Sequence, residues 1–131
     1  MFVLIVDDDN EDRELFEEAI GVVDSSIKCF SLKDGREAIH HLTNELVVLP
    51  DYIFLDINMP VMNGRECLIE IKRNSRLRHI PVIMYSTTSD TNEIRQFYNL
   101  GAHDFLIKPN NFKKLIEALN SIIMLKKSKV K

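Results

Sequence analysis

The sequence predicts an α/β protein in which five strands and five helices alternate around a parallel sheet. Three observations support this fold class. Short apolar runs recur along the chain, segments with helical periodicity lie between them, and the connections are short. No internal repeat, linker or low-complexity segment interrupts the alternation, so we expect a single domain in this chain of 131 residues.

The expected strands are apolar runs that end in polar or turn-forming residues. The run at 52–55 is apolar throughout, as in a strand buried on both faces of a sheet, and Pro60 and Asn63-Gly64 then turn the chain. The run at 27–30 is polar enough to lie at a sheet edge. The five expected strands are residues 2–6, 27–30, 52–55, 82–85 and 103–107.

The expected helices each carry apolar residues on one face. Asp9 or Asn10 is expected to cap the first helix, whose acidic first turn suits the positive end of the helix dipole. Asp90 is expected to cap the fourth helix, and Gly101 to follow its last turn. The apolar stripes are, in chain order, Leu15, Phe16, Ala19 and Ile20; Gly35, Ala38, Ile39 and Leu42; Gly64, Cys67, Leu68 and Ile71; Ile94, Phe97 and Tyr98; and Phe112, Leu115, Ile116, Leu119, Ile122 and Ile123.

Charge and hydropathy exclude several classes of function. The formal net charge of −3 is small and of the wrong sign for a nucleic-acid surface. The apolar start, residues 1–6, is too short for a signal peptide and lacks its basic flank, and no run reaches membrane-spanning length. We therefore expect a cytoplasmic protein with no nucleic acid or membrane as partner. Cys29 and Cys67 lie in apolar periodic segments and are expected to be reduced core thiols.

Polar groups follow four of the five expected strands, at the point where each strand ends. They are Asp7-Asp8-Asp9, Asp56, Ser86-Thr87 and Lys108. The carboxyl ends of parallel strands share one edge of the sheet, where ligands bind, so we expect these groups to meet. Each alone has an ordinary interpretation as a cap, a loop hydroxyl or a surface lysine. Their joint occurrence indicates a site.

The acids of this set favour a metal ion. Two carboxylates about 4 Å apart repel by roughly 4 kcal/mol at an effective dielectric near 20, and a divalent cation relieves that repulsion. Oxygen ligands without His or Cys suit Mg²⁺ better than zinc. A lysine and a hydroxyl opposite the metal would complete a cradle for a phosphoryl group.

Four motifs follow one another along the chain: Leu4-Ile5-Val6-Asp7-Asp8, Phe54-Leu55-Asp56-Ile57-Asn58-Met59-Pro60-Val61-Met62-Asn63-Gly64, Pro81-Val82-Ile83-Met84-Tyr85-Ser86 and Leu106-Ile107-Lys108-Pro109. In this order and spacing they resemble the motifs of the receiver domain of two-component response regulators, and the likeness runs over residues 2–124. The resemblance implies a doubly wound, flavodoxin-like sheet with strand order 2-1-3-4-5, in a receiver domain at residues 1–125 followed by a basic, frayed tail at 126–131. That tail is too short for an output domain, so a stand-alone receiver is expected.

The resemblance also implies a role for each site residue. Asp56 would accept a phosphoryl group from a sensor histidine kinase or phosphotransfer protein, and Mg²⁺ would be held by Asp7, Asp8, Asp56 and the backbone carbonyl of Asn58. The product would hydrolyse slowly, so the domain is a phosphoacceptor and not an enzyme. The remaining roles are contact with the phosphoryl group by Ser86 and Lys108, switching by Ser86 and Phe105, and tuning of hydrolysis by Asn58 and Thr88.

Further expectations from the resemblance concern the surface and the backbone. The fourth helix, fifth strand and fifth helix would change on phosphorylation and dock a downstream protein that the sequence does not identify. The Lys108-Pro109 bond is expected to be cis. Asn63-Gly64 replaces the more usual Asp-Gly, which should preserve the turn, and Ser86 stands where threonine is also common.

Several alternatives stay open at this stage. Phe105 could simply fill the core, because an apolar residue is expected at this position whether or not it acts as a switch. A Mg²⁺-dependent phosphatase could use Asp56, although such enzymes usually have a second Asp where this chain has Asn58. A phosphorylation-independent interaction domain, a phosphohistidine carrier using His40-His41, and a homodimer formed through the last helix are the others.

Overall fold

The computed structural model describes residues 1–45 and 48–130, with side chains for 1–44 and 48–124. All five strands are parallel and pair in the order β2-β1-β3-β4-β5, which confirms the predicted fold. The elements are β1 (Phe2–Val6), α1 (Asn10–Val23), β2 (Lys28–Leu32), α2 (Gly35–His40), the π-helical turn η1 (His41–Glu45), β3 (Tyr52–Leu55), α3 (Gly64–Arg73), β4 (Val82–Ser86), α4 (Thr91–Asn99), β5 (Asp104–Ile107) and α5 (Phe112–Val130).

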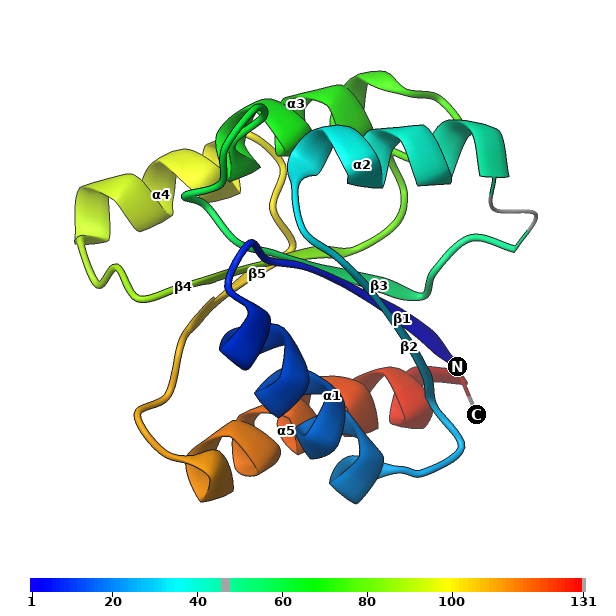
Figure 1. Cartoon of the computed structure of the whole chain (residues 1–131), viewed down its shortest axis with the longest axis vertical. Helices are drawn as coiled ribbons and strands as arrows, with labels where there is room; N and C mark the ends of the chain where they lie inside the picture. The colour runs from blue at the N-terminus through cyan, green and yellow to red at the C-terminus, as the bar shows by residue number, and fades with distance from the viewer. Residues whose placement is uncertain (46–47, 131) are drawn as a thin grey trace.

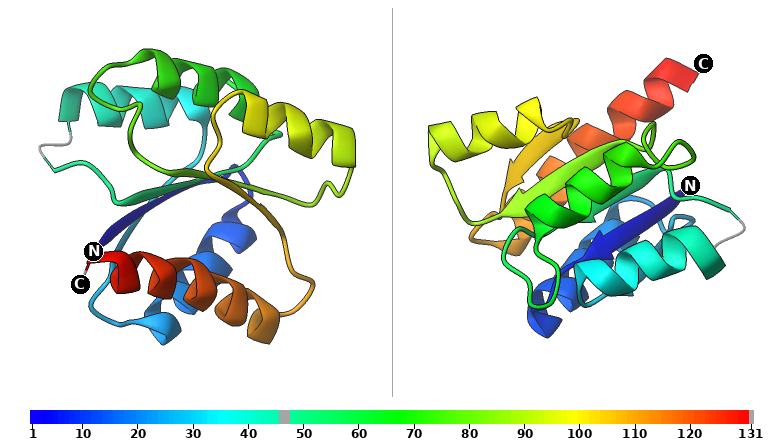
Figure 2. Two further views of the ribbon diagram at one scale, coloured as in Figure 1. Left: turned by 180° about the vertical axis from the view of Figure 1, so that it is seen from behind. Right: turned by 90° about the horizontal axis from the view of Figure 1, so that it is seen from above.

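The molecule has three layers, with the sheet in the middle. Helices α2, α3 and α4 cover one face of the sheet, and α1 and α5 lie side by side on the other (Figure 1). The views in Figure 2 show the same two helical layers from behind and from above. Within the described residues, no helix is long and apolar enough to cross a membrane.

The alternation of side chains along the central strands creates two separate cores. On β3, Ile53 and Leu55 pack under α2, α3 and α4, whereas Phe54 faces α1 and α5 together with Phe16. The rings of Phe16 and Phe54 lie 4.8 Å apart. Because both faces are covered, β1, β3 and β4 are buried almost throughout, as their apolar sequences predicted.

Side-chain caps fix where the helices begin. Asp9 caps α1 by accepting a hydrogen bond from the Asp12 amide, and Asp90 caps α4 in the same way. Asn63 forms a capping box with Glu66 at the start of α3. Gly101 follows α4 with a φ of 106°, a conformation that favours glycine. The caps predicted at Asp90 and at Asp9 or Asn10 are confirmed, the latter at Asp9.

Some boundaries differ from the sequence pattern. Strand β2 occupies 28–32, not 27–30, because it pairs with all of β1 in register. Helix α1 continues past Gly21 to Val23, and α5 continues to Val130. The division into a receiver domain at 1–125 and a tail at 126–131 stays a prediction, and Lys131 lies outside the described residues. Cys29 and Cys67 are both unpaired thiols, as predicted.

Candidate functional site

The predicted site residues lie at one edge of the sheet because the strand ladders extend past the strand ends. The Asp7 amide donates to the Leu32 carbonyl at 3.0 Å, and the Asp56 amide donates to the Val6 carbonyl at 2.9 Å. The Lys108 amide donates to the Ser86 carbonyl at 2.7 Å. Asp7 and Asp56 follow β1 and β3, which are neighbours where the strand order reverses, the usual ligand position in this class of sheet.

Three carboxylates converge at that position. Asp7, Asp8 and Asp56 each offer an oxygen, and these atoms lie within 4.8 Å of one another. Asp7 is fully buried and Asp56 is 7% exposed, whereas Asp8 is exposed to solvent. Asp7 Oδ1 accepts from the Asp9 amide, but the buried Oδ2 accepts no hydrogen bond. Three converging carboxylates form an all-oxygen set that fits a hard divalent cation, so these residues form a candidate metal site.

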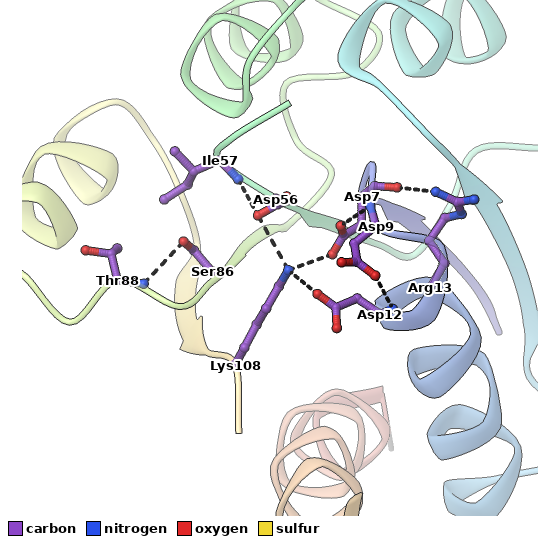
Figure 3. A network of polar contacts seen from close by, with 9 residues as sticks. All are labelled: Asp7, Asp9, Asp12, Arg13, Asp56, Ile57, Ser86, Thr88 and Lys108. Atoms are coloured by element: carbon purple, nitrogen blue, oxygen red, sulfur yellow. Dashed lines mark hydrogen bonds and ion pairs between the residues drawn. The ribbon is translucent and has the colours of Figure 1, made fainter. Parts of the chain in front are cut away.

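The Lys108 ammonium lies between carboxylates from three elements (Figure 3). Its Nζ is 2.8 Å from Asp12 Oδ2, with which it forms a hydrogen bond, and 2.9 Å from Asp7 Oδ2, outside hydrogen-bond geometry. It lies 3.7 Å from Asp56 Oδ1 and over the Tyr85 ring, 5.2 Å from its centre. Lys108 therefore forms ion pairs with Asp7, Asp12 and Asp56.

Burial and mutual repulsion make the two inner acids weak. Burial first, and then the negative charge of Asp7, raise the pKa of Asp56 to about 7, against the opposing effects of Lys108 and the Ile57 amide. Burial also raises the pKa of Asp7. Burial disfavours the charge of Lys108, but its contacts with Asp12 and Asp7 outweigh this and raise the pKa of Lys108. The arrangement holds negative charge that a cation would stabilise.

Ser86 lies on the opposite side of Asp56 from Asp7, Asp9 and Asp12 (Figure 3). The side chain of Ser86 is buried, and its Oγ accepts a hydrogen bond of 3.4 Å from the Thr88 amide. The Thr88 hydroxyl donates to Glu93 Oε2 in the first turn of α4 at 3.2 Å. The predicted hydroxyl is thus at the site, and it is linked through Thr88 to the helix that follows.

Phe105 and Asn58 are two further residues to which the resemblance assigned roles. Phe105 is half-buried on β5 and packs against Phe97 of α4, with ring centres 6.1 Å apart. This contact is compatible both with core filling and with a switching role. Asn58 is exposed in the loop after β3. Its predicted roles as a metal ligand and in hydrolysis stay predictions.

The loop from β3 to α3 holds the Asp56 backbone against the next helix. The Gly64 amide donates to the Ile57 carbonyl at 2.8 Å, and a Cβ at Gly64 would overlap the Asp56 carbonyl oxygen. Val61, in the middle of the loop, has a φ of 67°, a strained value for a β-branched residue. The Met62 amide donates to the Pro60 carbonyl across it at 2.7 Å.

Two residues at the site were not identified from the sequence. Asp12 was interpreted only as an acid suited to the start of α1, yet its Oδ2 lies 2.8 Å from the Lys108 amine. Arg13 donates to the Asp7 carbonyl at 2.7 Å and so supports the backbone of the acid pair. Asp8 lies before the Asp9 cap and outside α1, so helical spacing gives no signal that would have placed Asp12 beside the acidic pair.

One prediction from the resemblance is wrong. The Lys108-Pro109 bond is trans, not cis. The trans form is intrinsically favoured before proline by about 0.5–1 kcal/mol. Here it still allows the Lys108 amide to donate to Ser86 and the Lys108 amine to reach the acids, so nothing in the site requires the cis form.

A doubly wound sheet with an acidic triad, a lysine and a hydroxyl at its carboxyl edge defines a phosphoryl-accepting signalling domain. Residues 3–120 match the family model of the response regulator receiver domain. The chain belongs to this family. It is therefore a phosphoacceptor of two-component signalling and not a catalytic enzyme, which sets aside the phosphatase and phosphohistidine-carrier alternatives. Membership implies a histidine kinase as partner.

Curated relatives cover most of the chain. It is 32% identical over 124 residues to the response regulator Rcp1 of Synechocystis sp., covering 92% of this chain and 84% of that protein. It is also 32% identical over 120 residues to the two-component response regulator ORR13 of Oryza sativa subsp. japonica, covering 92% and 96%.

Solved structures of similar proteins have the same fold. The phosphorylated cyanobacterial phytochrome response regulator RcpA has a TM-score of 0.84 at 31% identity, covering 92% of this chain and 89% of that one. The Mn²⁺-bound form of Rcp1 has a TM-score of 0.81 at 30% identity, covering 92% and 90%. The chain is thus similar to one protein solved in a phosphorylated form and to one solved in a Mn²⁺-bound form.

Proposed function

We propose that Asp56 is the phosphoryl acceptor of this receiver domain. The observation that carries the proposal is the position of Asp56: buried at the end of β3, within 4.8 Å of the Asp7 and Asp8 oxygens and 3.7 Å from the Lys108 amine. Figure 3 shows Asp56 between the Ser86 hydroxyl and the Lys108 amine, with Asp7 on the side of Asp56 away from Ser86. A metal held by Asp7, Asp8 and Asp56 would neutralise charge.

The proposed reaction is a direct transfer between two side chains. A carboxylate oxygen of Asp56 attacks the phosphorus of a phosphohistidine on a sensor kinase or phosphotransfer protein. The new P–O bond forms as the P–N bond breaks, and the imidazole leaves with the electron pair and takes up a proton from solvent. Lys108 and the Ser86 hydroxyl bind and orient the equatorial phosphoryl oxygens.

We infer that the cation is Mg²⁺. Asp7, Asp8, Asp56 and the backbone carbonyl of Asn58 would hold it, and when bound it would offset the charge of the carboxylates and the phosphoryl group. The all-oxygen donor set supports this choice over zinc. The relative Rcp1, solved in a Mn²⁺-bound form, supports the binding of a divalent ion by this domain.

The proposed output is a surface change that a downstream protein recognises. Once a phosphoryl group is present, Ser86 would move toward it, and Phe105 would turn to fill the space. The link from Ser86 through Thr88 to Glu93 supports transmission of that movement into α4. Slow attack by water on the acyl phosphate, tuned by Asn58 and Thr88, would reset the site. The two unpaired thiols support a reducing compartment, and we place this cycle in the cytoplasm.

Intact-mass measurement after incubation with acetyl phosphate and Mg²⁺ tests the assignment. The wild-type chain should gain a single phosphate that is stable to acid and released by hydroxylamine, as expected for an acyl phosphate. Asp56→Asn should gain none, while Asp104→Asn, at the opposite end of β5 from the site, should behave as wild type. A wild-type chain that stays unmodified, or an Asp56→Asn chain that is modified equally, would refute the proposal.

A further inference from the structure

The Lys108 ammonium has fewer donors than the site has acceptors. It carries three N–H groups and faces carboxylates of Asp12, Asp7 and Asp56 at 2.8, 2.9 and 3.7 Å. The two short contacts are with acids on the α1 side of the site. The distance to Asp56 exceeds that of a charge-assisted hydrogen bond, which is about 2.7–2.9 Å. In the resting structure, the Lys108 amine thus lies closer to Asp12 and Asp7 than to Asp56, the proposed phosphoryl acceptor.

Of the two close partners, Asp12 is the one that is not a predicted metal ligand. Its side chain is 35% exposed, whereas that of Lys108 is only 12% exposed. Asp12 lies in the first turn of α1, where Asp9 is the cap, and its carboxylate accepts a hydrogen bond from Lys108 Nζ. Asp12 and Lys108 also line a cleft of about 200 Å³ with Tyr85, Pro109 and Asn110, so the pair borders open space.

We propose that Asp12 is a positioning residue that competes with the phosphoryl group for Lys108. This inference rests on the proposed function, in which Lys108 binds the phosphoryl group on Asp56. In the resting chain, the Asp12 carboxylate holds the amine on the α1 side of the site. During transfer, the amine must share or give up that contact to bind the incoming oxygens. Asp12 therefore slows phosphorylation and favours the unmodified state.

The charge of the site gives the competition its direction. An arriving phosphoryl group adds negative charge beside carboxylates that already exceed the available positive charge. The Asp12 carboxylate adds repulsion and also occupies the cation that would otherwise offset it. Removing this charge while keeping the shape of the side chain should thus lower the barrier. A residue that only supported Lys108 mechanically would have the opposite effect.

The test compares the rate of phosphorylation by acetyl phosphate with Mg²⁺ in matched variants of the full chain. Asp12→Asn should react roughly twofold to fivefold faster than wild type, the range expected for one partly exposed charge pair. Glu11→Gln removes a charge from the same helical turn at an exposed residue that does not contact Lys108, so it should change the rate far less. Asp12→Glu keeps the charge and should stay close to wild type.

A Lys108→Gln background shows whether Asp12 acts through the lysine. In this background, Asp12→Asn should accelerate phosphorylation no more than Glu11→Gln does. The reason is that the Lys108 amine, for which Asp12 and the phosphoryl group compete, is absent. An unchanged or slower Asp12→Asn chain, equal acceleration by Glu11→Gln, or full acceleration without Lys108 would each overturn the inference. A wild-type chain that takes no hydroxylamine-labile phosphate would instead refute the assignment of Asp56.

Discussion

At Asp56, burial and the neighbouring Asp7 carboxylate oppose the ionised form that a nucleophile needs. With a pKa of about 7, a large share of the Asp56 side chains in the metal-free chain is protonated at neutral pH. A cation bound to the same oxygens would favour the carboxylate. The metal would thus prepare the nucleophile as well as relieve repulsion between the acids.

This shift predicts how the stability of the metal-free chain depends on pH. The folded chain binds the Asp56 proton more tightly than the unfolded chain, whose Asp has the usual pKa of 3.8. The contribution of Asp56 to the free energy of unfolding should therefore fall as pH rises from about 4 to about 7, by roughly 3–4 kcal/mol. Thermal melts in a chelating buffer across this range measure it.

Asp56→Asn is the matched control for that pH dependence. It removes the ionisation but keeps the size of the side chain, so its melting temperature should vary less with pH and exceed that of wild type near pH 8. Adding Mg²⁺ should stabilise wild type more at pH 8 than at pH 5, because the ligands must be deprotonated. Equal slopes for the two chains would contradict the assigned pKa.

Val61 has a strained backbone conformation, and its replacement should stabilise the chain. Its φ of 67° is costly for a β-branched side chain, and it is 76% exposed, so little packing offsets the strain. Asparagine tolerates this conformation, and Val61→Asn should therefore raise the free energy of unfolding by about 1 kcal/mol in urea titrations. Val48→Asn, at another exposed valine, should give no comparable gain.

The sequence identified those site residues whose chemistry stands directly after a strand. Asp7, Asp56, Ser86 and Lys108 could be predicted because a parallel sheet brings such positions together. Asp12 could not, since an acid in a first helical turn has an ordinary explanation in the helix dipole. The positive φ of Val61 could not be predicted either, because valine disfavours a positive φ and its presence therefore does not indicate one.

The loop from β3 to α3 brings the Gly64 backbone into close contact with the backbone of Asp56 and Ile57. Gly64→Ala should destabilise the chain by about 3 kcal/mol, because its Cβ would overlap the Asp56 carbonyl oxygen and lie 2.7 Å from Ile57 Cα. Phosphorylation should fall too, since relief of the overlap moves Asp56. Urea unfolding and the mass assay measure the two effects.

Gly21 is the matched control for that substitution. It lies within α1, and a Cβ there would meet nothing within 4 Å. Gly21→Ala should stabilise the chain by roughly 0.5–1 kcal/mol, since alanine loses less conformational entropy in a helix. A Gly64→Ala chain as stable as wild type would show that the loop adapts without cost.

Helix starts could be predicted where a capping side chain precedes an apolar stripe, as at Asp90. The turn His41–Glu45 was missed, because nothing in its composition distinguishes a π-helical turn from the fading end of a helix. The trans bond at Pro109 was missed for a different reason. That expectation came from the resemblance alone, and the residues around it are satisfied without the cis form.

Across the whole molecule, the sequence supported a parallel sheet, but the strand order came from the resemblance. Apolar runs show that β1 and β3 are buried on both faces; they do not show which strands are neighbours. The order nevertheless decides the function, because it places Asp7 beside Asp56. A different order of the same strands would have left the acids on separate parts of the edge.

The packing of the molecule is uneven, and this predicts which segments should open most readily. Strands β3 and β4 are buried at every position, whereas β5 is at most half-buried and Phe97 is the single buried residue of α4. Segments with few buried contacts open more readily. In hydrogen exchange of the resting chain, amides of α4 and β5 should therefore exchange roughly tenfold or more faster than those of β1 and β3.

Phosphorylation should act on that same weakly packed end, because Ser86 connects to α4 through Thr88 and Glu93 and lies beside β5 in the sheet. With acetyl phosphate and Mg²⁺, exchange should change in the segment 86–107 and stay constant in β1 and β3. Asp56→Asn under the same conditions separates phosphorylation from metal binding, and it should show no change in α4. Changes confined to α1 and α5 would mean that the signal leaves the site by the opposite face of the sheet.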